Sequence, residues 1–305
     1  MTGLLRFAHI SDLHLSSLRG LGGRRLLGKR LLGYLSWRRK RRFEHRRDVL
    51  DALTRQLLAL SFEQTLITGD LLHIGLPEEF RQAQAWLERL GPADKLALVP
   101  GNHDAYAPET WDQSFAHWQA YLQGDVPAPQ DQTIYPSLRR RGPVAFIGLS
   151  TALPSPPFMA TGRLGEAQLS ALAKLLRDCR HEGLFRVVYL HHPPLTGGEK
   201  WRKRLVDCAA FEALLRVEGA ELVLHGHSHK NLDRELTGPR GAIPVVGLAS
   251  SSARGDYDQV AAFGDYQLQD PVDKNTWILN RTLWHWDKQV GEFLAGETRR
   301  WHLEP

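Results

Sequence analysis

The chain has 305 residues, of which 42% are hydrophobic, 24% are charged and two are cysteines, and its formal net charge is +5. This length allows a sizeable core, and two cysteines exclude a disulfide framework or a zinc knuckle, so we expect a reducing, cytoplasmic location. No basic and apolar leader precedes the first predicted strand and no run of eighteen apolar residues occurs, so we expect neither a secretory signal nor a membrane span.

Short apolar runs alternate with helical patterns along most of the chain. The runs that predict β-strands span residues 5–10, 65–68, 96–99, 187–190 and 222–224. The stretches with apolar residues at helical spacing span residues 48–60, 77–90, 111–122, 166–180 and 207–217. Further β-rich runs at 243–248, 260–268 and 277–286 should extend a second sheet. The pattern indicates an α/β core with ligands at the strand ends, in a single domain over residues 1–305 that carries one inserted segment.

That segment, residues 16–47, is called the basic insert here. It holds twelve Lys and Arg residues and one acidic residue, a net charge of +11, whereas the remainder holds 27 basic and 33 acidic residues, a net charge of −6. Leu27, Leu31 and Leu35 recur at helical spacing, so we expect an amphipathic basic helix. The residues expected to contact a membrane or a substrate are Arg24, Arg25, Lys29, Arg30, Leu31, Tyr34, Trp37, Arg38, Arg39, Lys40, Arg41 and Arg42.

Three interpretations of the basic insert stay open. It can be a lid packed on the rest of the domain. It can bind an anionic membrane, because Leu, Tyr and Trp interleave with cations that each add about 1 kcal/mol near an anionic surface. A nucleic-acid contact is the less favoured third interpretation. Because the insert begins two residues after His14, it acts beside whatever site the following motifs build.

Five short motifs follow the predicted strands. In order they are Asp12-x-His14, Gly69-Asp70, Gly101-Asn102-His103-Asp104, His191-His192-Pro193-Pro194 and Gly226-His227-Ser228-His229. Imidazole nitrogens, carboxylate oxygens and an amide oxygen suit Mn, Fe, Zn or Co ions better than Ca²⁺. In an extended chain, ligands two residues apart point to the same side, so each pair can enter one site. Two divalent ions about 3.5 to 4 Å apart share a bridging anion and can hold a hydroxide that attacks phosphorus.

This series of motifs resembles that of the calcineurin-like metallophosphoesterase superfamily, over the span from Asp12 to His229. The resemblance implies a double β-sandwich flanked by α-helices (α/β/β/α) and two divalent or mixed-valence transition-metal ions. It further implies that one ion is held by Asp12, His14, Asp70 and His229, and the other by Asp70, Asn102, His191 and His227, with Asp70 as the bridge. His103 would contact the phosphate and protonate the leaving alkoxide, a contribution of roughly 10² to 10⁴ in rate, with Asp104 orienting its ring.

The resemblance implies a metallophosphoesterase, and the pattern looks most like the class III cyclic-nucleotide phosphodiesterase and glycerophosphodiesterase branch. The basic insert favours a membrane-linked or nucleotide-containing phosphodiester, with the protein peripheral on the inner membrane face. Some family members that cleave the pyrophosphate of UDP-diacylglucosamine carry a basic, apolar cap of similar character at a different position. The alternatives are a soluble cyclic-nucleotide phosphodiesterase, a DNA exonuclease and a non-catalytic scaffold that binds membrane or protein. Metal identity, natural substrate and oligomeric state stay open.

Overall fold

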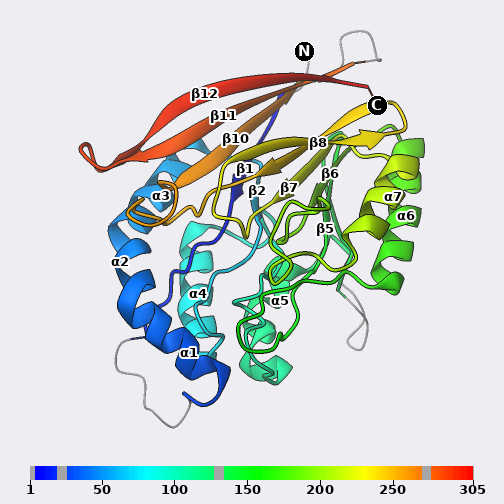
Figure 1. The fold of residues 1–305 in the computed structure, drawn as a ribbon. Helices are drawn as coiled ribbons and strands as arrows, with labels where there is room; N and C mark the ends of the chain where they lie inside the picture. Colours follow the sequence, from blue (N-terminus) through cyan, green and yellow to red (C-terminus); the bar gives the residue numbers. More distant parts are fainter. Residues whose placement is uncertain (1–3, 19–25, 127–133, 270–275, 305) are drawn as a thin grey trace.

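Two six-stranded β-sheets form the centre of the computed structural model, which describes residues 4–18, 26–126, 134–269 and 276–304 (Figure 1). In spatial order the first sheet consists of β12 (Glu292–Leu303), β11 (Trp277–Asp287), β10 (Ala262–Gln269), β1 (Leu4–Ile10), β2 (Gln64–Ile67) and β3 (Leu96–Leu98). The second consists of β4 (Ser137–Arg141), β5 (Val144–Gly148), β6 (Phe185–Tyr189), β7 (Leu222–His225), β9 (Gly241–Gly247) and β8 (Leu232–Gly238). Strands β1, β2 and β3 run parallel, as do β5, β6, β7 and β9.

Three apolar layers join the sheets to each other and to the helices. The flanking helices are α3 (Arg47–Leu60), α4 (Pro77–Leu90), α6 (Glu166–His181) and α7 (Cys208–Glu218). One layer packs α3 and α4 on the first sheet, one lies between the sheets, and one packs α6 and α7 on the second sheet. Phe7 and Ala8 of β1 enter different layers because successive side chains of a strand point to opposite faces. This helix, sheet, sheet, helix order confirms the predicted α/β/β/α double β-sandwich (Figure 1).

Two elements differ from expectation. The helix predicted over 111–122 is broken into η3 (Trp111–Gln113), η4 (Phe115–Trp118) and α5 (Gln119–Leu122). Ser114 interrupts it, because its hydroxyl donates to the Thr110 carbonyl at 2.6 Å and its backbone is not helical. Of the three late β-rich runs, the first forms β9 and extends the second sheet as expected, whereas the other two form β10 and β11 of the first sheet. There β10 pairs antiparallel with β1, β11 with β10 and β12 with β11.

The structure bears on two expectations, one about the cysteines and one about membrane-spanning helices. Cys179 and Cys208 are free and buried, so the cysteines form no disulfide, as predicted. Within the described ranges, each helix is too short or too polar to cross a bilayer. The location in the cell stays a prediction.

The motif loops leave the carboxyl ends of parallel strands. The strands β1, β2, β3, β6 and β7 are followed, in that order, by Asp12, Asp70, Asn102, His191 and His227. The loops hold one another through the backbone, since the Asp12 amide donates to the Gly69 carbonyl at 3.0 Å and the Gly226 amide to the His191 carbonyl at 3.0 Å. The carboxyl ends of both sheets therefore meet at one shared edge.

The basic insert folds onto the body beside these loops. It forms α1 (Lys29–Ser36), the π-helical stretch η2 (Trp37–Arg41) and α2 (Arg42–Glu44). Trp37 is only 5% exposed, and it packs in an apolar cluster with Leu18, Ile74, Leu76 and Tyr106. A Cβ on Gly33 would lie 2.5 Å from Ile74 Cγ2, so glycine permits this close approach. One side of the insert is thus part of the core.

Glu44 anchors the end of the insert. Its buried carboxylate accepts hydrogen bonds from the backbone N–H groups of all four residues in the range 255–258, at distances of 2.9 to 3.3 Å. Its own carbonyl accepts from the Arg254 amide at 2.8 Å. This single side chain ties the insert to the loop between β9 and β10.

Replacing Glu44 with Ala should lower the free energy of unfolding by about 3 kcal/mol or more, because it leaves four partly buried backbone N–H groups without an acceptor. Glu44→Gln keeps one acceptor oxygen and should lose less. The exposed Glu292→Ala control should stay within about 0.5 kcal/mol of the wild type in urea unfolding. A Glu44→Ala protein as stable as this control would show that the anchor is dispensable.

Candidate metal centre

Two groups of imidazole and carboxylate side chains lie where the motif loops meet. The first group consists of Asp12, His14 and His229, and the second of Asp70, His191 and His227. Within each group the potential ligand atoms lie within 4.8 Å of one another, and all six residues except His229 are buried. Each group has the residue types and the spacing to hold a metal ion.

Asp70 lies between the two groups. Its Oδ2 is 3.4 Å from His191 Nε2 and 4.0 Å from His14 Nε2. Its Oδ1 accepts the backbone N–H of His103 at 2.7 Å. Asn102 joins the second group, with Oδ1 3.2 Å from His191 Nε2. The structure thus brings together all seven side chains that the sequence predicts as metal ligands.

The ligand candidates have an unusual backbone conformation. Of the seven non-glycine residues with positive φ in the described ranges, five are Asp12, His14, Asp70, His227 and His229, with φ between 42° and 67°. This left-handed conformation costs an L-residue about 1–2 kcal/mol and concentrates at functional sites. The extended geometry expected for Asp12-x-His14 and His227-x-His229 is therefore wrong, because sharp turns, not strand pleating, bring each pair into one site.

Motif glycines permit the close contact of the loops. Gly69 has φ of 89°, and a Cβ there would lie 2.5 Å from the amide nitrogen of Gly101. A Cβ on Gly226 would lie 1.8 Å from Ser11 Oγ. Any larger residue at these two positions would push the ligand loops apart.

Backbone carbonyls fix two of the imidazole rings. His14 Nδ1 lies 2.7 Å from the Leu72 carbonyl, and His191 Nδ1 lies 2.7 Å from the Thr68 carbonyl. Since a carbonyl only accepts, each Nδ1 carries a proton and each Nε2 points into the site, where it can bind a metal ion once it is deprotonated. Among the described residues, the buried His14 Nε2 has no hydrogen-bond partner. Such an orphaned lone pair fits a ligand to a metal ion.

Opposite charges stabilise each other within the site. Burial lowers the pKa of His191, but the Asp70 carboxylate outweighs it and raises this pKa to about 9. Burial also lowers the pKa of His229, whereas Asp12 and Asp258 raise it to about 9. Burial raises the pKa of Asp12, and His229 brings it down to about 2. The carboxylates thus favour a positive charge beside them, which is the electrostatic condition for binding a metal cation.

His103 follows the ligand candidate Asn102, but Asp104 does not orient its ring as expected. His103 Nδ1 donates instead to the His73 carbonyl at 2.6 Å. The Asp104 carboxylate accepts at 2.8 to 3.1 Å from the backbone N–H groups of Asp70, Leu71, Leu72 and Gly101. Because these donors occupy both oxygens, Asp104 holds the Asp70 loop in place and not the imidazole.

Two residues near the site were not singled out from the sequence. Asp258 Oδ2 lies 3.0 Å from His229 Nδ1 and so orients that ring. His45, His229 and Asp258 form a further group of potential ligands. The ring centroid of His45 lies 4.4 Å from that of His14. Glu44, the one acidic residue of the basic insert, directly precedes His45, and this break in the basic composition could have marked His45 as a candidate. Nothing in the sequence places the loop of Asp258 at the site.

The predicted contact residues of the basic insert divide into three sets. Arg24 and Arg25 lie outside the described residues. The exposed members are Leu31, Arg38, Arg39, Lys40 and Arg42. The partly or fully buried members are Lys29, Arg30, Tyr34, Trp37 and Arg41. Arg41 reaches the site itself, where its Nη2 lies 2.8 Å from His103 Nε2.

A cleft of about 540 Å³ opens beside Asn102 and His103. Its cations are Lys29, Arg39, Arg41, Lys200, Arg202 and Lys203. Its larger apolar or aromatic side chains are Leu32, Leu35, Tyr106, Phe158 and Met159. None of the described residues that line it is acidic. The cleft therefore suits a negatively charged ligand with an apolar part.

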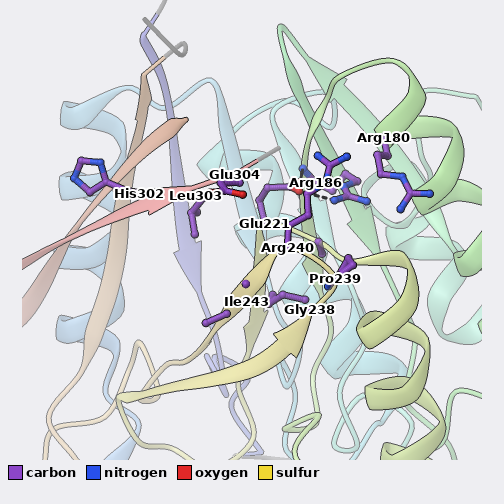
Figure 2. A pocket seen from close by; sticks show the side chains of 14 residues that line it. Arg180, Arg186, Glu221, Gly238, Pro239, Arg240, Ile243, His302, Leu303 and Glu304 are labelled. Carbon is purple, nitrogen blue, oxygen red and sulfur yellow. Dashed lines mark hydrogen bonds and ion pairs between the residues drawn. The ribbon is translucent and has the colours of Figure 1, made fainter. Parts of the chain in front are cut away.

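A smaller hollow of about 140 Å³ lies at the opposite edge of the second sheet (Figure 2). Arg186 at the amino end of β6 and Glu221 just before β7 form a buried ion pair there, with 2.5 Å between Nη2 and Oε1. The charges of these two residues are thus already matched. No group of three potential metal ligands occurs there in the described part of the chain, so the metal chemistry belongs to the other edge.

Comparisons with known proteins agree with this geometry. The family model for calcineurin-like phosphoesterases matches residues 5–231, which include every motif. A dimetal phosphatase from Danio rerio is 14% identical, with a TM-score of 0.61 and 98% of both chains covered. The NAD nucleotidase NadN of Haemophilus influenzae is 13% identical, with a TM-score of 0.50, and the match covers 97% of this chain and 54% of NadN.

At these identities the two solved structures show the fold alone. A search of curated proteins found no match. The family match rests on the motif region itself and spans well over half of the residues. The chain therefore belongs to the calcineurin-like phosphoesterase family and is a hydrolase of phosphoric ester bonds.

Proposed function

We propose that the chain is a binuclear, metal-dependent phosphodiesterase that acts on an amphiphilic, membrane-linked or nucleotide-containing phosphodiester. The cleft carries this proposal, because it joins six cations to an apolar wall beside His103 and Asn102. Its volume lies in the range of small-molecule sites. A headgroup with more than one negative charge fits the cations, and an acyl chain or another apolar group fits Leu32 and Leu35.

The proposed metal ligands divide between the two groups. One ion is held by Asp12, His14, Asp70 and His229, and the other by Asp70, Asn102, His191 and His227. The position of Asp70 Oδ2 between both groups and the orphaned His14 Nε2 support this division. When bound, two divalent ions neutralise charge on the phosphoryl group and make water a nucleophile at neutral pH.

The chain's own residues position the substrate and move a proton. Hydrolysis breaks the P–O bond to the leaving alcohol and joins the oxygen of water to phosphorus, so the leaving oxygen has to gain a proton. His103 lines the cleft with its ring fixed by the His73 carbonyl, and its Nε2 can take a proton from solvent water and pass it to that oxygen. The cations of the cleft offset the charge that develops on the phosphoryl oxygens.

Replacing Asp70 with Ala should reduce bound manganese from two ions per chain to one or fewer and abolish turnover. The reason is that both ions lose a shared carboxylate. Mass spectrometry of bound metal and the spin-coupled Mn signal in electron paramagnetic resonance measure the effect. The control is Asp178→Ala, an exposed carboxylate on α6. A spin-coupled pair with normal turnover in the Asp70 variant would contradict the bridge.

The substrate proposal is tested with Mn-loaded protein on five substrate types, each with and without anionic vesicles. They are bis-p-nitrophenyl phosphate, cyclic AMP, glycerophosphodiesters, UDP-diacylglucosamine and single-stranded DNA. The lipid-linked substrate should give the highest kcat/KM, and vesicles should raise it. A higher kcat/KM for cyclic AMP or DNA would contradict the lipid-linked substrate class. No turnover by protein with two bound ions would contradict the enzymatic function.

We also propose that the outer side of the basic insert docks on an anionic membrane. Apolar and cationic side chains alternate along this side. The exposed apolar members that do not line the cleft are Leu27, Leu31 and Phe43, and the exposed cations there are Arg38 and Arg42. Leu27 is 76% exposed and Phe43 is 48% exposed, which is costly in water and favourable in a headgroup layer.

The double variant Arg38→Gln/Arg42→Gln should weaken partitioning to phosphatidylserine vesicles about 30-fold, at about 1 kcal/mol for each cation. Sedimentation with vesicles measures it, and circular dichroism checks the fold. The matched control Lys174→Gln/Arg216→Gln removes two exposed cations from α6 and α7, which lie on the other side of the molecule (Figure 1). Equal partitioning of both variants would rule out membrane docking through the insert.

A further inference from the structure

The basic insert delivers one side chain to the reacting end of the cleft. Arg41 lines the cleft together with Asn102 and His103. Its Nη2 lies 2.8 Å from His103 Nε2, and its Nη1 lies 3.0 Å from His103 Nδ1. Its neighbour Lys40 has a carboxylate partner, Asp258, at 3.9 Å. Within the described ranges, Arg41 has no such ion pair.

A largely buried guanidinium without a carboxylate partner calls for an anion. Among the described residues, no carboxylate lines the cleft with Arg41, and Asp70, the acidic residue with the largest effect on its pKa, lies 3.4 Å from His191 Nε2 in the metal centre. The cleft itself therefore leaves room for an anion from outside the protein. The planar fork of an arginine matches two oxygens of a phosphate group. We propose that Arg41 binds the non-bridging oxygens of the substrate's reacting phosphoryl group, an inference that rests on the proposed function and adds an insert-borne ligand to it.

Two buried residues, one before and one after Arg41 in the sequence, fix the backbone that carries it. Trp37, four residues earlier, is buried in the apolar cluster on the body, and Glu44, three residues later, accepts four backbone N–H groups. The stretch that starts at the first anchor, Trp37–Arg41, is π-helical, a winding often found at functional sites. The insert therefore presents this arginine at a set place.

The contact with His103 describes the site before an anion enters. A neutral imidazole is a weaker partner than a phosphate group, because it carries no opposite charge, whereas a phosphate offers two charged oxygens to the guanidinium fork. A phosphoryl group that enters the cleft thus takes over the donors of Arg41. His103 Nε2 is then free to take a proton from solvent water and pass it to the leaving oxygen of the ester.

The test compares the wild type with Arg41→Ala, Arg41→Lys and Arg47→Ala, each as Mn-loaded full chain. Arg47 is exposed at the start of α3 and does not line the cleft, so its variant removes the same charge elsewhere. For bis-p-nitrophenyl phosphate, Arg41→Ala should lower kcat/KM about 10² to 10³-fold, and Arg41→Lys should recover part of it, since lysine lacks the fork. Arg47→Ala should equal the wild type.

Calorimetric titration with inorganic phosphate gives a second readout that does not need turnover. The Kd should rise about tenfold or more in Arg41→Ala while two manganese ions stay bound. An unchanged Kd, or kcat/KM within twofold of an active wild type, would overturn the role of Arg41. An inactive wild type would instead contradict the proposed function, and the phosphate Kd of the variants would still decide the inference.

Discussion

The apolar layer between the two sheets is the interaction on which the rest of the structure depends. Phe7 of β1 meets Phe146 of β5 there, with 5.2 Å between ring centroids. Each ligand group needs both sheets, since His229 from the second sheet completes the group of Asp12, and Asp70 from the first completes the group of His191. Loss of this packing would separate both groups at once.

The metal centre requires an arrangement that an unconstrained chain would avoid. Five ligand candidates are held at positive φ, and buried imidazoles and carboxylates face one another. Strain of this kind persists only where surrounding contacts determine the conformation. Asp104 supplies such contacts, because its carboxylate collects four backbone N–H groups of the loops around Asp70. A residue expected in catalysis thus acts through the backbone.

The ligand candidates could be predicted because each combines a strand signal with a chemically distinctive residue. The run before Asp12 or before His191 marks a strand end, and the residue type marks the chemistry. Asp258 could not be predicted, and Arg41 could be predicted only as one of several contact residues of the basic insert, because tertiary packing alone brings them to the site. The sheet to which β10 and β11 belong was predicted wrongly for a related reason. An alternating pattern shows which side chains of a strand face the core, but it does not show which strand pairs with it.

The basic insert links the outer surface to the reacting centre. Its inner side contributes Trp37 to the core, Glu44 to the loop of Asp258, and Arg41 to the cleft, while its outer side stays apolar and cationic. The lid and membrane interpretations are therefore compatible, because they concern opposite sides of one segment.

Anomalous diffraction at the manganese edge, from crystals grown with Mn²⁺, tests the central claim most directly. The account predicts two peaks about 3.5 to 4 Å apart, one among Asp12, His14 and His229 and one among Asp70, His191 and His227. A single peak, or peaks away from these side chains, would contradict a binuclear centre built on Asp70.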